Sequence, residues 1–139
     1  GVDLSEAALT SPAEAAQFVK ETGVDLFAPA VGNIHGILRN VHDPRLNIKR
    51  VQEIKEAVKI PLVLHGGSGT VDEDFTNAIK SGVGIVHINT EIRVAYRDAV
   101  KQAITEHPDE VAPYKIMKGA VSAMQRVIEA RLKLFNHLI

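Results

Sequence analysis

An apolar run that ends in a histidine and a glycine-rich loop constrains the fold of this chain more than any other stretch. Residues 60–65 are Ile-Pro-Leu-Val-Leu-His, and residues 66–69 are Gly-Gly-Ser-Gly. A short continuous apolar run is typical of a strand that is buried on both faces of a parallel sheet. The next residues, Thr70–Glu73, have the capping-box pattern of a helix start. The stretch therefore predicts a strand, a glycine-rich loop and a helix over about 71–80.

The loop after this strand has two possible roles. Glycines allow a ligand to approach the backbone closely, and their N–H groups can point at an anion. A histidine at the end of the strand then suggests a metal ion beside a phosphate. The alternative is a flexible turn between strand and helix, with His65 as an ordinary core histidine. Residues 60–69 alone leave this choice open.

Helices and strands alternate along the rest of the chain. Ser11-Pro12-Ala13-Glu14 is a second capping box with proline at the first helical position, and Gly23 is a suitable stop. Apolar residues at helical spacing, or in short continuous runs, predict the other elements. These are a strand over 24–31, a helix over 46–58, a strand over 83–88, and helices over 91–106 and 113–136. Pro29 is unfavourable within the first of these strands.

This alternation predicts a parallel sheet built from βα units. Three strands alone would leave sheet edges and faces uncovered. A complete (β/α)8 barrel needs about 250 residues, whereas this chain has 139 residues. We therefore expect an α/β fold in which residues 1–139 form one partial TIM barrel, the C-terminal part of a longer barrel, with no second domain.

Composition excludes several classes of function. Hydrophobic residues make up 45% and charged residues 24% of the chain, which is ordinary for a globular protein, and the net charge of −1 provides no basic surface for nucleic acid. The absence of cysteine excludes disulfides and thiolate metal ligands. No apolar run has the length of a membrane span, and no signal peptide is recognisable. We therefore expect a cytoplasmic protein that binds neither nucleic acid nor membranes.

Histidines follow two of the three predicted strands. Gly32–Gly36 (Gly-Asn-Ile-His-Gly) follows the first, His65–Gly69 follows the second, and Asn89-Thr90-Glu91 follows the third. In a βα-barrel the chemistry lies at the carboxyl ends of the strands, and a phosphate site often follows the last two. Two histidines at such ends, His35 and His65, could bind one zinc ion at about 2.0–2.1 Å. A catalytic zinc usually takes a third protein ligand, which this sequence does not reveal.

These motifs resemble those of the class II, zinc-dependent fructose-bisphosphate aldolases. The matching sequences are Gly32–Gly36, Pro61–Gly69 and, more weakly, Ile88–Arg93, and the likeness extends over about residues 10–136. The resemblance implies that the chain is the C-terminal half of a (β/α)8 barrel. Its strands would be the sixth to eighth, followed by a long C-terminal helix.

The resemblance also implies roles for individual residues. His35 and His65 would bind the catalytic zinc, which acts as a Lewis acid on the substrate carbonyl. A substrate phosphate, often with a monovalent cation beside it, would lie at the glycine-rich loop and at the end of the last strand. The residues implied for phosphate and substrate binding are Gly36, Gly66, Ser68, Asn89 and Thr90.

The resemblance implies a lyase of glycolysis that reversibly cleaves fructose 1,6-bisphosphate to dihydroxyacetone phosphate and glyceraldehyde 3-phosphate. It also implies a homo-oligomer. In this family the remaining zinc-binding histidine and the proton-exchanging aspartate lie in the first half of the protein. Neither motif is present here, so we expect no catalytic acid–base residue in the chain and no activity from residues 1–139 alone. The alternatives are a tagatose-bisphosphate aldolase, a metal-free phosphate-binding barrel and a non-catalytic interaction domain.

Two further features have less specific interpretations. For His87 we expect a core or supporting role, with substrate contact as the alternative. Apolar side chains at helical spacing over 116–135 are expected to serve packing or a subunit contact rather than a cofactor site.

Overall fold

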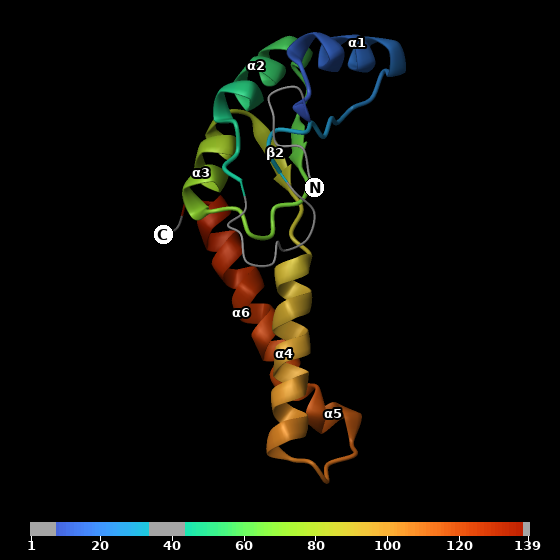
Figure 1. Cartoon of the computed structure of the whole chain (residues 1–139), viewed down its shortest axis with the longest axis vertical. Helices are drawn as coiled ribbons and strands as arrows, with labels where there is room; N and C mark the ends of the chain where they lie inside the picture. Colours follow the sequence, from blue (N-terminus) through green and yellow to red (C-terminus); the bar gives the residue numbers. More distant parts are fainter. Residues whose placement is uncertain (1–7, 34–43, 138–139) are drawn as a thin grey trace. The chain divides into compact units, whose positions relative to one another are not determined.

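A computed structural model of the chain describes residues 8–33 and 44–137 (Figure 1). These residues belong to two compact units, one within Gly1–Ile88 and the other within Asn89–Ile139. The strands and the glycine-rich loop belong to the first unit. Helices make up the regular structure of the second.

The sheet of the first unit is parallel, as the alternating pattern predicts. Strand β1 (Leu62–Leu64) pairs with β2 (Val83–Val86), with Leu62 opposite Val83 and Leu64 opposite Val86. On its other side, β1 forms a single parallel bridge between Leu62 and Phe27. All three residues of β1 are buried, in agreement with the central place that its continuous apolar sequence predicts.

The strand predicted over 24–31 is reduced to that bridge at Phe27. The Phe27 N–H donates to the Pro61 carbonyl (3.2 Å), and the Phe27 carbonyl accepts from the Val63 N–H (2.9 Å). Two residues later Pro29 has no N–H to donate to a ladder. Ala30 then pairs elsewhere, because its N–H donates to Thr10 Oγ1 and its carbonyl accepts from the Thr10 N–H, both at 2.9 Å.

Three helices pack around these strands. Helix α1 (Pro12–Thr22) begins with the predicted capping box, and α2 (Ile48–Val58) begins at Asn47, whose side chain accepts from the Arg50 N–H. Helix α1 packs against α2, and α3 (Asp72–Lys80) contacts both α2 and β2. Side chains with less than 2% of their surface exposed form the core, and the largest are Phe75, Ile54, Leu62, Leu64, Val31, Val51 and Asp74.

The capping box predicted at Thr70 is wrong. The residue before α3 is Val71, which provides no side-chain cap, and the helix begins at Asp72. Thr70 is instead buried and donates its N–H to the Gly67 carbonyl (3.1 Å), which closes a turn of the glycine-rich loop. Thr70 is therefore part of the glycine-rich loop and not, as the sequence pattern predicts, the N-cap of α3.

The second unit is built around two long helices. Helices α4 (Thr90–Glu106) and α6 (Lys118–Phe135) lie side by side and antiparallel, with α5 (Pro113–Ile116) near the turn between them (Figure 1). Glu91 in the first turn of α4 accepts two hydrogen bonds from the Arg131 guanidinium, both at 2.8 Å. This bidentate ion pair ties the start of α4 to the last third of α6.

The single helix predicted over 113–136 is divided at Met117. Met117 keeps right-handed helical angles (φ −80°, ψ −10°), and its N–H donates to the Pro113 carbonyl (2.8 Å). Gly119, two residues later, lowers the helix propensity at this junction. The division is therefore a local interruption in a segment that is helical on both sides.

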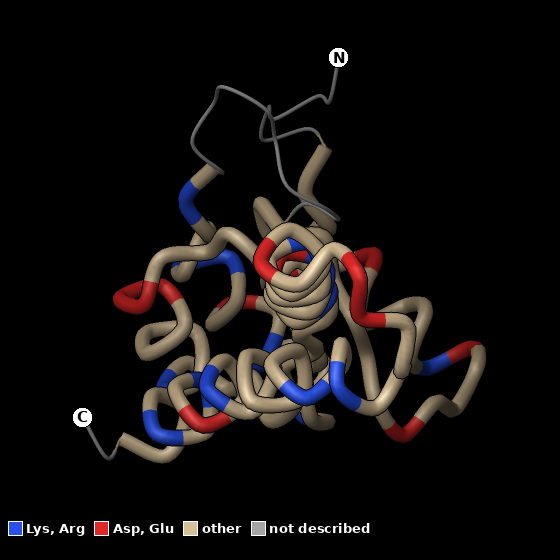
Figure 2. The backbone as a smooth tube through the Cα atoms, turned by 90° about the horizontal axis from the view of Figure 1, so that it is seen from below, with Lys and Arg blue, Asp and Glu red and all other residues tan. Residues whose placement is uncertain are grey.

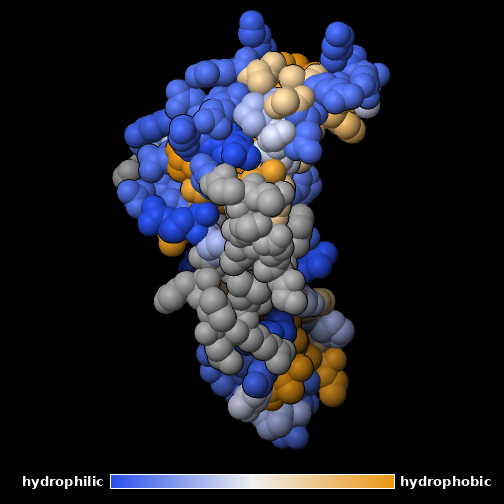
Figure 3. All heavy atoms as spheres, turned by 45° about the horizontal axis from the view of Figure 1, so that its top comes forward, coloured by the Kyte–Doolittle hydropathy of each residue, from blue (hydrophilic) through white to orange (hydrophobic). Residues whose placement is uncertain are grey.

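Apolar and charged side chains both reach the surface. Exposed apolar side chains of the helical unit include Ile104, Val111 and Val121, and Figure 3 shows hydrophobic atoms gathered at the α5 end of that unit. Figure 2 shows that both basic and acidic residues are distributed along the backbone. Within residues 8–33 and 44–137, no helix has the length and apolar character needed to cross a membrane.

Candidate functional site

His65 stands at the carboxyl end of β1, where the sequence places it. Its side chain is half-buried, and its ring contacts the ring of His87 in an edge-to-face arrangement, with centroids 4.4 Å apart and planes at 82°. The contact is fixed by the backbone, because the His87 N–H donates to the Leu64 carbonyl (2.9 Å) and so continues the β1–β2 pairing. His87 itself is exposed, so it is not a core residue, and the choice between a supporting role and substrate contact stays a prediction.

The glycine-rich loop turns sharply directly after His65. Gly66 has a φ of +63° and Gly69 a φ of +101°, conformations that side-chain-bearing residues rarely adopt. Ser68 is enclosed within this turn, with only 3% of its surface exposed. The backbone of the loop therefore takes a sharp turn whose angles favour glycine at two positions.

Gly67 is required for a different reason, which is close packing. A Cβ at this position would lie 3.1 Å from Phe75 Cε1 and 3.1 Å from Ile88 Cδ1, and the Phe75 side chain is fully buried. We expect Gly67→Ala to lower the free energy of unfolding by about 1–3 kcal/mol, the usual cost of overpacking a core. Urea unfolding of the intact protein measures this change.

Gly119→Ala is the matched control for Gly67→Ala. A Cβ at Gly119 meets no atom within 4 Å, and the residue lies in α6. Alanine is favoured over glycine in a helix by about 1 kcal/mol, so this variant should be at least as stable as the wild type. Equal stability of the two variants would contradict the packing argument.

Asn33 joins two strand ends that are far apart in sequence. Its Oδ1 accepts from the Val31 N–H (2.8 Å), and its Nδ2 donates to the His65 carbonyl (3.0 Å). The neighbouring Gly32, with a φ of +104°, leaves room for the chain around Arg45, because a Cβ on Gly32 would lie 2.8 Å from the Arg45 carbonyl oxygen. These contacts hold the segment after Val31 against the start of the loop.

Arg45 is held in turn by Asp74 in the first turn of α3. The Arg45 guanidinium donates to both Asp74 carboxylate oxygens at 2.7–2.9 Å, and the Leu46 N–H donates to Asp74 Oδ2 (2.9 Å). Burial alone would raise the pKa of Asp74, which is 2% exposed, but the hydrogen bonds from Arg45 and Leu46 and the positive charge of Arg45 hold that pKa below its ordinary value. Asp74 is therefore a buried carboxylate that stays ionised.

The other predicted site residues lie elsewhere in the chain. Asn89 is the exposed residue directly before α4, with no side-chain capping bond, and Thr90 is the first residue of that helix. Both belong to the second unit. His35 and Gly36 lie outside the described residues. The structure thus brings His65, Gly66 and Ser68 into one loop and leaves the other assignments as predictions.

His65 fits the demands of a zinc ligand. Imidazole nitrogen is a usual zinc donor, and the residue lies half-buried at a strand end, where β1 and the loop fix its backbone. Within residues 8–33 and 44–137, no group of three or more histidine, aspartate or glutamate side chains could hold a metal ion together. The described part of the chain therefore contributes one of the predicted ligands.

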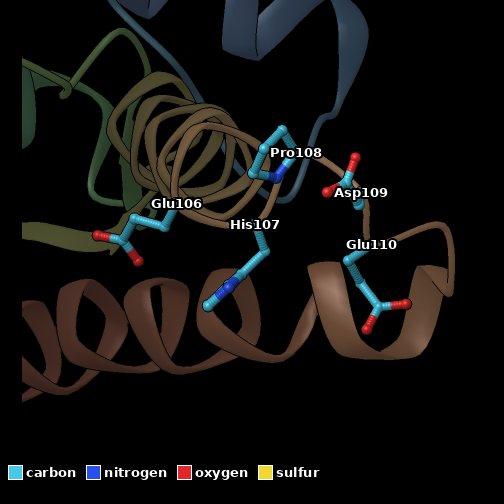
Figure 4. A pocket seen from close by; sticks show the side chains of 5 residues that line it. All are labelled: Glu106, His107, Pro108, Asp109 and Glu110. Atoms are coloured by element: carbon cyan, nitrogen blue, oxygen red, sulfur yellow. The ribbon is translucent and has the colours of Figure 1, made fainter.

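The hollows of the second unit share no residue with the predicted site. One of about 440 Å³ is lined by Glu106, His107, Pro108, Asp109 and Glu110 (Figure 4). Figure 4 shows the carboxylate of Glu106 on one side of His107 and those of Asp109 and Glu110 on the other, and Glu110 is paired with Lys115 at 2.7 Å. This arrangement does not converge on a bound ion.

Sequence analysis gave no role to two residues that shape the site. Asn33 is part of the Gly32–Gly36 motif, but its bond to His65 depends on the meeting of two segments 32 residues apart. Asp74 resembles any other acidic residue of a first helical turn, where acids are common. Only its burial and its bond to Leu46 distinguish it.

The chain is similar to known aldolases over nearly its whole length. A sequence model of the class-II fructose-bisphosphate aldolases matches residues 1–138. The YdjI aldolase from Escherichia coli K12 is 35% identical, with a TM-score of 0.75 over 91% of this chain and 46% of that chain. A protein from Coccidioides immitis, provisionally described as a fructose-1,6-bisphosphate aldolase, is 31% identical, with a TM-score of 0.78 over 92% and 43% of the two chains.

A third structure supports the fold alone. Fructose-bisphosphate aldolase from Campylobacter jejuni is 22% identical, with a TM-score of 0.74 over 94% of this chain and 46% of that chain. The chain thus spans slightly less than half the length of these structures. These similarities confirm the predicted α/β architecture, a partial (β/α)8 barrel. The chain belongs to the class-II fructose-bisphosphate aldolase family.

Proposed function

We propose that the intact protein is a zinc-dependent lyase that reversibly cleaves fructose 1,6-bisphosphate to dihydroxyacetone phosphate and glyceraldehyde 3-phosphate. The observation that carries this proposal is the end of β1, where His65 is followed at once by a glycine-rich turn that encloses Ser68. A metal ligand and an anion-binding backbone are thereby contributed by one loop. Because the chain belongs to the aldolase family, we interpret this combination as part of a site for a metal ion and a sugar phosphate.

In this proposal His35 and His65 hold the zinc ion. The bound zinc would supply a Lewis acid for the substrate carbonyl. The chain's own contribution is to hold the His65 imidazole in place through β1, through the edge contact with His87 and through the loop that follows. The proton-transferring group would come from residues outside this chain.

The phosphate would be bound by backbone N–H groups of the loop, those of Gly66 and Ser68 among them, with Gly36 beside them. The first turn of α3 carries three acidic residues, Asp72, Glu73 and Asp74, which offset the positive end of that helix. The loop rather than the helix end is therefore the proposed anion site. Asn89 and Thr90 are proposed to contact phosphate and substrate hydroxyls. A monovalent cation is proposed beside the phosphate, and both assignments follow from the family resemblance.

Ser68→Ala tests the phosphate assignment. The variant should raise KM for the bisphosphate by about 10–150-fold, because a hydrogen bond to a charged group is worth about 1.5–3 kcal/mol and every 1.4 kcal/mol is tenfold, while backbone N–H donors remain. Steady-state kinetics and a thermal melt of the intact protein measure both effects. Ser81→Ala, at the end of α3, is the control substitution. An unchanged KM for Ser68→Ala would remove its hydroxyl from the proposal.

The activity itself is tested with the intact protein. A coupled assay should detect triose phosphates from fructose 1,6-bisphosphate, lose that signal on chelation and regain it with zinc. Tagatose 1,6-bisphosphate is the competing substrate, because the two sugars differ in one hydroxyl configuration. Undiminished cleavage after zinc removal would favour a metal-free mechanism, and no cleavage of either sugar would favour a non-catalytic role.

Three accompanying expectations belong to the same proposal. The protein would act in glycolysis in the cytoplasm and would be an oligomer of identical chains, for which light scattering is the measurement. Residues 1–139 expressed alone should be inactive, because the proposed site needs groups that these residues do not supply. Measurable cleavage by residues 1–139 would contradict that requirement.

A further inference from the structure

The geometry points to Asn33 as a positioning residue: we propose that its side-chain amide sets the orientation of the His65–Gly66 peptide and thereby serves both the zinc ligand and the phosphate-binding loop. The proposal rests on the function proposed above and extends it to a residue outside the ligand set. Asn33 is half-buried, and both ends of its amide are used.

The amide replaces sheet hydrogen bonds that are missing at this point. Segment 24–31 pairs with β1 only at Phe27, since Pro29 lacks an N–H and Ala30 is bonded to Thr10. Among the described residues, the bond from Asn33 Nδ2 to the His65 carbonyl is therefore the hydrogen bond that joins the two strand ends beyond Phe27. The bond from Val31 N–H to Asn33 Oδ1 fixes the amide so that Nδ2 faces His65.

The bond acts on two functional groups at once. A peptide unit is planar, so the direction of the His65 carbonyl determines the direction of the Gly66 N–H. The backbone leaves β1 and enters the loop at Gly66, which has a φ of +63°. Loss of the Asn33 bond would remove one restraint on this peptide, so both the His65 backbone and the Gly66 N–H would be less well placed.

Asn33→Asp isolates the contact with His65. Aspartate has the same shape and keeps an acceptor for the Val31 N–H, but an ionised carboxylate cannot donate to the His65 carbonyl. We expect this variant to bind zinc about 10–100-fold more weakly, as loss of an outer-shell partner usually does. We also expect a higher KM for the bisphosphate, because the Gly66 N–H is displaced.

The measurement is zinc affinity of the intact protein, by competition with a chromogenic chelator, which needs no turnover. Asn136→Asp is the matched control, because Asn136 Nδ2 likewise donates to a backbone carbonyl, that of Leu132 (2.8 Å), at the end of α6. The control should keep the zinc affinity of the wild type. If circular dichroism shows that Asn33→Asp is unfolded, Asn33→Ala, which removes both amide bonds without adding a charge, is measured instead and should also bind zinc more weakly.

The outcomes separate this inference from the proposed function. Wild-type zinc affinity in Asn33→Asp, with zinc lost in His65→Ala, would overturn the role of Asn33 and leave the aldolase proposal intact. A lower melting temperature with unchanged zinc affinity would make Asn33 purely structural. Weaker zinc binding in Asn33→Asp, in a protein that cleaves neither sugar bisphosphate, would support the inference and overturn the proposed activity. A wild-type protein without zinc affinity would overturn both.

Discussion

His65→Ala is expected to remove zinc from the intact protein and to abolish most of its sugar-bisphosphate cleavage. Loss of an outer-shell partner alone typically costs about 10–100-fold in metal affinity or activity, and loss of a direct ligand should exceed that range. The residue is half-buried at the end of β1, and β1 itself carries only apolar side chains, so the strand offers no second ligand. Elemental analysis after dialysis measures the zinc.

His107→Ala is the control for His65→Ala. His107 follows α4 in the helical unit and lines a hollow that shares no residue with the predicted site. Its replacement should leave zinc content and turnover unchanged. Normal zinc content in His65→Ala, or an equal loss in both variants, would contradict the assignment of His65 as a ligand. His35→Ala should behave as His65→Ala does.

Asp74→Ala should be the most destabilising of the charge-removing substitutions in the first unit. It removes a carboxylate that is 2% exposed and leaves the buried Leu46 N–H without its acceptor. We expect the free energy of unfolding to fall by about 2–4 kcal/mol. This range lies between the value of a hydrogen bond to a charged group and the cost of breaking a buried ion pair. Urea unfolding measures this loss.

Glu73 provides the comparison for Asp74. Its carboxylate also accepts from Arg45 (2.8 Å), but its side chain is 70% exposed. An exposed ion pair contributes only about 0–1 kcal/mol, so Glu73→Ala should be close to the wild type. An equal loss of stability in the two variants would mean that pairing with the charge of Arg45, rather than the buried bond to Leu46, stabilises the fold.

The same carboxylate predicts a pH dependence of stability. The pKa of Asp74 is lower in the folded chain than its ordinary value, so its ionised form stabilises the fold. That contribution is complete above the unfolded-state pKa of about 3.9 and disappears as the pH falls below it, through the lower folded-state pKa. The stability difference between wild type and Asp74→Asn should therefore shrink below about pH 4.

Helices and buried strands were predictable because their signals are local. The capping box at Ser11 and the apolar run of β1 each depend on a few consecutive residues, and the structure contains both elements. Segment 24–31 has an equally apolar sequence, yet it pairs only at Phe27. Pro29, which lacks an N–H, indicates this loss of pairing from within the segment. The bonds between Ala30 and Thr10 depend on a residue outside it.

The residues of the candidate site also differ in how far sequence alone predicts them. His65, Gly66 and Ser68 are consecutive or nearly so, and a strand followed by a glycine-rich turn brings them together without information from elsewhere. Asn33 bonds across 32 residues to the His65 carbonyl and Asp74 across 28 residues to the Leu46 N–H, and backbone groups carry no sequence signal. Sequence thus indicates which residues could do chemistry but not which side chains hold them in place.

The meeting of Gly32 with Arg45 has a consequence for how this protein can vary. Because the Val31 carbonyl accepts from the Asn47 N–H at 2.8 Å, both ends of the intervening stretch are anchored to one another. The entropy of closing such a stretch grows only slowly with its length, by about 0.6 kcal/mol for each doubling. Insertions between these two anchored ends should therefore cost little stability, while β1 and α2 keep their places.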